Sequence, residues 1–148
     1  MASNTTFVSG AILTAQQMNN LPWGVQAYNK RTAGNTTITT SVTDIAGATG
    51  TFTAVTGRAY KVSFTGNMNT TSGAVTYLRL NNGASAIYEF LLTGVSGYRV
   101  ISPTYIVTGL TAGSVTLKMT GQTDTGTALV LGTSGNPASF IIEDIGIA

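Results

Sequence analysis

Apolar and polar residues alternate most regularly in residues 57–69, GRAYKVSFTGNMN, and this alternation predicts a long β-strand. Tyr60, Val62 and Phe64 would lie on one side of that strand, with Lys61 and the other odd-numbered residues on the opposite side. A strand with one buried face and one exposed face requires this period of two. We expect the later strands to pack around this segment.

Turn residues recur at regular intervals along the rest of the chain and divide it into short β-prone segments. The predicted strands are residues 36–45, 51–55, 74–80, 86–92, 98–107, 114–122, 127–131 and 138–145. Asn81, Asn82 and Gly83 form a strong hairpin signal between two of them. Residues 25–35 are expected to be a linker into the domain, and the small residues 46–50 to form a loop.

Two of these segments carry specific expectations. Residues 86–92, AIYEFLL, are almost continuously apolar, which predicts a strand covered on both faces. Residues 98–107 contain Pro103, and proline cannot donate a hydrogen bond to a β-ladder. This second segment is therefore expected to be an edge strand, a bulge or two short strands.

No segment after residue 24 has a convincing helical period, and about eight to ten short strands in one domain are typical of two packed sheets. The predicted fold class is therefore all-β, an antiparallel β-sandwich, with a jelly roll as the expected topology. In this interpretation residues 25–148 form the sandwich domain, and residues 1–24 form an N-terminal anchoring arm.

The arm is expected to carry one helical turn. Thr14 is a candidate N-cap for a short helix over residues 15–20, which Pro22 and Gly24 would end. A helix this short is marginal in water unless it lies on a surface. That surface is either the open end of its own sandwich or a neighbouring subunit or larger particle. Trp23 is correspondingly either a core plug or an interface anchor.

Charged residues make up only 8% of the chain, against about 25% in an ordinary soluble domain. A surface built from Thr, Ser, Asn and Gly repels copies of itself weakly, which suits a protein that sits in an assembly. The net charge of +2 comes with seven scattered Lys and Arg residues, and their scatter argues against nucleic-acid binding. Neither a secretory signal nor a membrane-spanning apolar run is recognisable, so we expect no membrane partner.

The chain contains neither His nor Cys, which excludes Ser-His-Asp and Cys-His catalysis and zinc sites of the usual kind. We therefore predict no enzyme activity, no cofactor, and no catalytic or metal-ligating residues. Glycoside hydrolysis needs two carboxylates that face one bond, and Glu143 and Asp144 point to opposite faces of a predicted strand. Sequence alone leaves open whether Glu89 meets another acid in space. It also leaves open sugar binding by exposed Tyr and Asn side chains.

The other acidic residues have structural interpretations. Glu89 is expected to pair with Arg79 or Arg99 across a sheet. Asp44 and Asp124 lie beside predicted turns, where Asp commonly caps backbone groups. These interpretations leave no acid with an assigned chemical role.

Residues 7–24, FVSGAILTAQQMNNLPWG, resemble the start F-x-x-G-x-x-L-T-A-x-x-x-N-x-x-P-x-G of small virion proteins of tailed bacteriophages. Residues 51–60, TFTAVTGRAY, and residues 140–146, FIIEDIG, are similar to phrases of the same group, which includes minor tail and capsid decoration proteins. The resemblance implies a β-sandwich head, frequently a trimer, that is held by an N-terminal arm. It implies no catalytic residues.

The sequence thus leads us to expect a non-enzymatic structural protein of a bacteriophage virion, assembled in the host cytoplasm. Its partners would be further copies of itself in a homotrimer and other virion proteins such as capsid or tail subunits, with capsid decoration slightly favoured over the tail. The alternative is a minor tail or tail-fibre protein whose head binds a receptor or host surface glycan. The residues expected to dock the arm at the assembly interface are Phe7, Ile12, Leu13, Leu21, Pro22 and Trp23.

Overall fold

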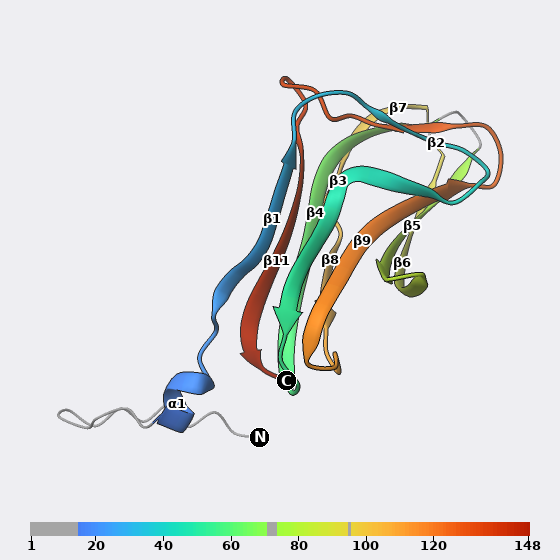
Figure 1. Cartoon of the computed structure of the whole chain (residues 1–148). Coiled ribbons are helices and arrows are strands. Elements are labelled where there is room, and N and C mark those ends of the chain that lie inside the picture. Colours follow the sequence, from blue (N-terminus) through green and yellow to red (C-terminus); the bar gives the residue numbers. More distant parts are fainter. Residues whose placement is uncertain (1–14, 71–73, 95) are drawn as a thin grey trace.

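The computed structural model describes residues 15–70, 74–94 and 96–148, which are built almost wholly from antiparallel β-strands. Two sheets pack face to face with the hydrophobic core between them (Figure 1). The prediction of an all-β, antiparallel sandwich is therefore confirmed. No helix within the described ranges is long and apolar enough to cross a membrane.

The larger sheet has seven strands arranged around β4 (Arg58–Thr70), the segment with the most regular alternation. The others are β1 (Gly24–Arg31), β2 (Thr36–Ile38), β7 (Gly97–Ile101), β8 (Thr104–Val107), β10 (Ala128–Val130) and β11 (Ala138–Ile147). One side of β4 pairs with β11 and β10, and the other side pairs with β8 and β7. β1 extends the sheet beyond β11, and β2 extends it beyond β10.

The smaller sheet has four strands. They are β3 (Thr43–Ala54), β5 (Val75–Asn82), β6 (Ser85–Thr93) and β9 (Gly113–Thr123), in the order β3-β9-β5-β6. β5 and β6 form the hairpin predicted from Asn81, Asn82 and Gly83, and Gly83 has a φ of 59°. Glycine suits this turn because it has no Cβ to oppose a positive φ.

Pro103 separates β7 from β8, so residues 98–107 form two short strands, one of the arrangements that proline predicted. Both strands pair with β4. At the break, the carbonyl of Pro103 accepts a hydrogen bond from the backbone N–H of Phe64 at 3.1 Å. The interruption therefore removes a donor from the outer strand without opening the sheet.

Even-numbered residues of β4 point into the core, as their alternation predicted. Val62, Phe64 and Met68 are at most 1% exposed. Phe140 and Ile142 of β11 lie in register beside Phe64 and Val62, and both are 0% exposed. Full burial of one such side chain stabilises the fold by about 1.5–3 kcal/mol. The interface between the sheets thus holds the domain together.

Residues 25–35 were predicted to be a linker, and this was wrong, because Gly24–Arg31 forms strand β1 against β11. A register shift between Val25 and Ala27 breaks the alternation of the strand. The strand also lies at the edge of its sheet, where its side chains are exposed or only partly buried. Without a consistently buried face, it carries no clear hydrophobic period.

Residues 46–50 do not form a loop either, because they lie inside β3. The ladder between β3 and β9 shifts register within this segment. Gly50 is buried against the larger sheet, where a Cβ atom would lie 2.8 Å from Ile142 Cδ1 and 2.9 Å from Ala27 Cβ. The small residues therefore mark a close approach of the two sheets rather than a turn.

Residues 86–92 were expected to be covered on both faces, but β6 is the outer strand of the smaller sheet. Ile87, Tyr88 and Leu91 are 37%, 42% and 53% exposed. Phe90 and Leu92 pack partly against the core. The continuous apolar run therefore combines one core-facing side with apolar residues that remain on the surface.

The predicted short helix is present as α1 (Ala15–Asn19). It lies beyond one end of the sandwich rather than on either sheet (Figure 1). Thr14, the predicted N-cap, is outside the described residues. The chain between α1 and β1 brings the arm to the end of the sandwich, where β4 begins and β11 ends.

Candidate functional site

A buried ion pair joins the first residue of β4 to the end of β11, next to the point where the arm meets the domain. Arg58 and Asp144 are 4% and 1% exposed, and Arg58 reaches both carboxylate oxygens through Nε and Nη2. The backbone N–H of Gly146 donates to the same carboxylate at 2.9 Å. Buried charges require a close partner and further hydrogen bonds to offset the loss of water, and Asp144 has both.

Arg58 also fastens the arm to the sandwich. Its Nη1 donates to the carbonyl of Asn19, the last residue of α1, and its Nη2 donates to the carbonyl of Leu21 at 2.6 Å. The indole ring of Trp23 lies over the guanidinium, whose Cζ is 4.1 Å from the ring centroid. The backbone N–H of Trp23 donates to Asp144 at 3.4 Å. Hydrogen bonds and a cation–π contact thus fix the chain between α1 and β1.

The electrostatics of Asp144 follow from these contacts. Burial by itself raises the pKa of the Asp144 carboxyl, but hydrogen bonds from Arg58 and from two backbone N–H groups outweigh it. Together with the charge of Arg58, they hold the pKa of Asp144 below its ordinary value of 3.8. A carboxyl whose folded-state pKa is lowered stabilises the fold above its unfolded-state pKa, and this stabilisation is lost as the pH falls.

Replacing Asp144 with asparagine is expected to lower the free energy of unfolding at pH 7 and to have a smaller effect in acid. At pH 7 the variant lacks the ionised partner of Arg58, whereas in acid the wild-type carboxyl is itself protonated. The difference in unfolding free energy between the two proteins should therefore narrow as the pH falls through and below about 4, the ordinary pKa of an aspartic acid. Urea unfolding at a series of pH values measures it.

The matched control for this titration is Glu143→Gln, because Glu143 is the neighbouring acid and its side chain is 33% exposed in an ion pair with Lys61. Its effect on the free energy of unfolding should stay at or below about 1 kcal/mol at every pH. A difference between wild type and Asp144→Asn that stayed constant into acid would contradict the role assigned to the ionised carboxylate.

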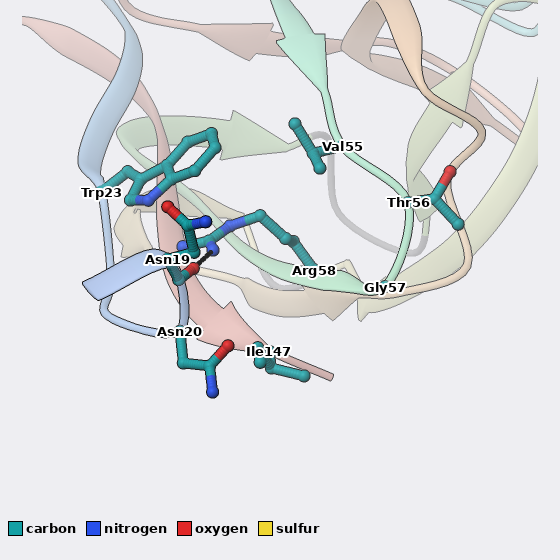
Figure 2. A pocket seen from close by; sticks show the side chains of 8 residues that line it. All are labelled: Asn19, Asn20, Trp23, Val55, Thr56, Gly57, Arg58 and Ile147. Carbon is teal, nitrogen blue, oxygen red and sulfur yellow. Dashed lines mark hydrogen bonds between the residues drawn. The ribbon is translucent and has the colours of Figure 1, made fainter. Parts of the chain in front are cut away.

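A cleft of about 390 Å³ lies between the base of the arm and the turn that joins β3 to β4 (Figure 2). The residues that line it are Asn19, Asn20, Trp23, Val55, Thr56, Gly57, Arg58 and Ile147. Arg58 is its ionisable lining residue, and the guanidinium is already engaged with Asp144 and two carbonyls. An aromatic ring beside the amide side chain of Asn19 suits an uncharged polar ligand or a protein surface, and this lining offers no acid–base pair (Figure 2).

The structure places half of the predicted docking residues. Leu21, Pro22 and Trp23 lie together between α1 and β1, and all three are exposed. Leu21 and Trp23 are 45% and 50% exposed although their backbone is held by the ion pair. Outside the described residues lie Phe7, Ile12 and Leu13. The base of the arm therefore combines a fixed backbone with apolar side chains that remain available.

Sequence reasoning did not single out Arg58 and Asp144, although the signal was present in the alternation. Arg58 occupies an even-numbered position of β4, in step with buried Tyr60, and Asp144 occupies an even-numbered position of β11, in step with buried Ile142. The pattern that predicted the core therefore placed two opposite charges on the same buried side. Opposite charges on a buried face predict an ion pair, because neither would be stable there alone.

Two other acids have the structural roles that the sequence predicted. Glu89 Oε2 lies 2.7 Å from Arg79 Nε, which selects one of its two expected partners. Asp124 caps a backbone group, because it accepts a hydrogen bond at 2.7 Å from the N–H of Val75, the first residue of β5. This hydrogen bond is the main reason that the pKa of Asp124 lies below its ordinary value.

The remaining two acids form surface ion pairs. Asp44 differs from the expected turn cap, because its Oδ2 lies 2.9 Å from Nζ of Lys118. Glu143 points away from Asp144, as predicted, and its Oε2 lies 2.7 Å from Nζ of Lys61. No three acids of the described ranges gather as a metal site would require. All five carboxylates are therefore engaged in contacts within the fold.

No protein-family model matches this chain, and a search of curated proteins finds no significant match to it. Family membership is therefore not shown. The function is inferred from the geometry at the base of the arm, from the surface of the sandwich, and from the short phrases at residues 7–24, 51–60 and 140–146.

Proposed function

We propose that this chain is a non-enzymatic structural protein of a bacteriophage virion, a trimeric β-sandwich attached to the particle surface by its N-terminal arm. The observation that carries this proposal is the way Arg58 holds the arm. It binds the carbonyls of Asn19 and Leu21, while the side chains of Leu21 and Trp23 stay about half exposed. An arm with a fixed base and exposed apolar side chains is suited to bury them on a second protein.

The chemistry of the surface supports an assembly role over catalysis. Each carboxylate is engaged by a basic side chain or a backbone N–H, so none is left as an evident general acid or base. Only 8% of residues are charged, so copies of the protein placed side by side repel one another weakly. Weak repulsion between copies suits a protein that is packed beside its own copies on a particle, and it is of no use to an enzyme that acts alone in solution.

We infer further that the sandwich is a jelly roll, and the pairing of its strands supports this. β1 pairs with β11, β2 with β10, β3 with β9, β4 with β7 and β8, and β5 with β6. The pairs are nested, so the chain runs as one long ribbon that doubles back at the β5–β6 hairpin. Rolling such a ribbon into two sheets gives the two Greek keys of a jelly roll.

Deletion of residues 1–18 tests the proposed function. The cut spares Asn19 and Leu21, whose carbonyls Arg58 binds, so the sandwich should unfold at the same urea concentration as the full chain. The truncated protein should be incorporated into purified phage particles less than the full chain, because it lacks Phe7, Ile12 and Leu13, half of the expected docking residues, and keeps only Leu21, Pro22 and Trp23. Immunoblotting of particles measures incorporation, and gold-labelled antibody in electron microscopy locates the full chain on capsid or tail.

We favour the capsid surface as the site of attachment. Gold label on the tail would instead identify the chain as a tail protein. The full chain in parallel infections is the control for expression. Particles that incorporate the truncated and full chains equally would overturn the role of the arm. Particles that contain neither would overturn the proposal itself.

The cleft at Trp23 favours one alternative, a tail protein whose head binds a host surface glycan. A half-exposed indole beside the amide of Asn19 provides a stacking face and hydrogen-bonding groups of the kind that sugars use (Figure 2). A glycan array probed with the full chain separates the two functions. Binding that is lost in Trp23→Ala would support the alternative, and an array without signal would remove it.

A further inference from the structure

The outer face of the larger sheet carries apolar side chains at both of its margins. On β4 the odd-numbered residues point outward, because the even-numbered ones fill the core. Apart from Ile147, which lines the cleft at Trp23, five large apolar residues of this sheet are 45–70% exposed. They are Val25, Tyr28, Tyr98, Val100 and Ile106, and we call them the margin residues.

The strand register places the margin residues on one continuous face. Val100 and Tyr98 of β7 lie opposite Asn67 and Asn69 of β4, and Ile106 of β8 lies opposite Lys61. Directly opposed residues of antiparallel strands point to the same side of the sheet.

The other margin follows from the same rule. Val25 and Tyr28 of β1 lie opposite Glu143 and Ile141 of β11, which in turn lie opposite Lys61 and Ser63. All the margin residues therefore lie on the outer face of the larger sheet. Between the margins lie serine, threonine and asparagine side chains, together with Ile141 and the Lys61–Glu143 ion pair.

We propose that this outer face is the surface on which a second copy of this chain docks. The inference rests on the oligomeric state in the proposed function and assigns it a surface.

Charge supports a second copy as the occupant. The cation Lys61 and the anion Glu143 pair with each other at 2.7 Å, and of the further residues in register only Lys30, opposite Ser139, adds a charge. The face thus carries close to one net positive charge, so two copies meet without strong repulsion. The smaller sheet is more highly charged, because two ion pairs, Arg79–Glu89 and Lys118–Asp44, cross it.

The exposed area also fits. Scaling the ~150–250 Å² of an aromatic side chain by the 59% and 69% exposure of Tyr28 and Tyr98 gives roughly 190–320 Å² for these two residues. The exposed aliphatic side chains of Val25, Val100 and Ile106 add to this area. The serine, threonine and asparagine side chains between them bring the face toward the ~800 Å² per partner of a standard protein interface.

Docking uses the face rather than the edge of the sheet. At the β8 edge, the hydroxyl of Tyr88 donates to the carbonyl of Ile106 at 2.6 Å, and the ring of Tyr88 stacks on Tyr105 with centroids 5.0 Å apart. This side chain occupies an acceptor that strand addition would require.

The test is Val100→Lys in the full chain, analysed by sedimentation over a range of concentrations. Val100 is 70% exposed, so the substitution removes little from the core, and unfolding by urea should change little. A lysine on this face of every copy buries a charge at each interface and should weaken self-association by about tenfold or more. Tyr28→Lys, on the opposite margin, is a second variant with the same expected result.

Thr53→Lys is the matched control, because Thr53 is an exposed strand residue of the smaller sheet. It should associate like wild type. A wild-type chain that stays monomeric at high concentration would overturn the inference, as would Val100→Lys and Tyr28→Lys variants that associate normally. Attachment to particles is measured separately, by incorporation of the arm deletion. The docking surface and the role of the arm can therefore fail independently of each other.

Discussion

Replacing Arg58 with methionine is expected to lower the free energy of unfolding by about 3–5 kcal/mol, because it leaves a buried carboxylate without its partner. Asp144 is 1% exposed, and Arg58 supplies both of its side-chain hydrogen bonds. Urea unfolding at pH 7 measures the loss. Trp23 is the single tryptophan and lies on the guanidinium of Arg58. In the folded Arg58→Met variant, without urea, its fluorescence should therefore be shifted to the red relative to that of wild type.

Two variants make this result specific. Lys61→Met breaks an ion pair whose side chains are 42% and 33% exposed, and it should cost at most about 1 kcal/mol. The double variant Arg58→Met with Asp144→Leu removes both buried charges and should recover part of the lost stability. It should not restore the wild-type emission wavelength of Trp23, because the carbonyls of Asn19 and Leu21 still lack the guanidinium that donates to them. An Arg58 variant no less stable than Lys61→Met would contradict the assigned role.

The sequence predicted the sandwich well where one face of a strand is buried and the other exposed. β4 and β9 have that environment, and their alternation identified them. Turn chemistry identified the β5–β6 hairpin, and the missing donor of Pro103 identified the division between β7 and β8. In each case a local rule and the final packing agree, so the pattern is visible without the rest of the chain.

Alternation failed where the environment of a strand is set by residues far away in sequence. β1 lies at an edge and contains a bulge, so nothing within it reveals the partner β11. Gly50 resembles a loop residue because the side chains that require the position to be small, Ile142 and Ala27, are distant in sequence. The exposure of β6 likewise depends on its being last in the sheet, which its own residues do not encode.

The same limit applies to the base of the arm. The apolar character of Leu21 and Trp23 predicted docking residues, but their positions depend on hydrogen bonds from a residue more than thirty positions later. Arg58 and Asp144 are 86 residues apart in sequence and are joined only through the pairing of β11 with β4. Alternation gives the side of the strand on which each charge lies, and the fold alone brings the two together.

Replacing Phe140 with alanine is expected to lower the free energy of unfolding by about 3–5 kcal/mol, because it empties a closely packed part of the core. Phe140 is 0% exposed and lies in register with Phe64 of β4. It also faces Gly50 of the opposite sheet, where a Cβ would lie 3.4 Å from Phe140 Cε1 and 2.8 Å from Ile142 Cδ1. Any side chain at Gly50 therefore overpacks the intact core, and Gly50→Ala should cost about 1–3 kcal/mol.

The two substitutions should not be additive. In the Phe140→Ala background, Ile142 can move into the vacated space, so Gly50→Ala should cost at least about 1 kcal/mol less than in wild type. Gly83→Ala is the control, because no atom lies within 4 Å of its Cβ position and its cost arises only from a positive φ. That cost should be the same in both backgrounds. Equal costs for Gly50→Ala in both backgrounds, measured by urea unfolding, would show that the sheets do not meet at Gly50 and Phe140.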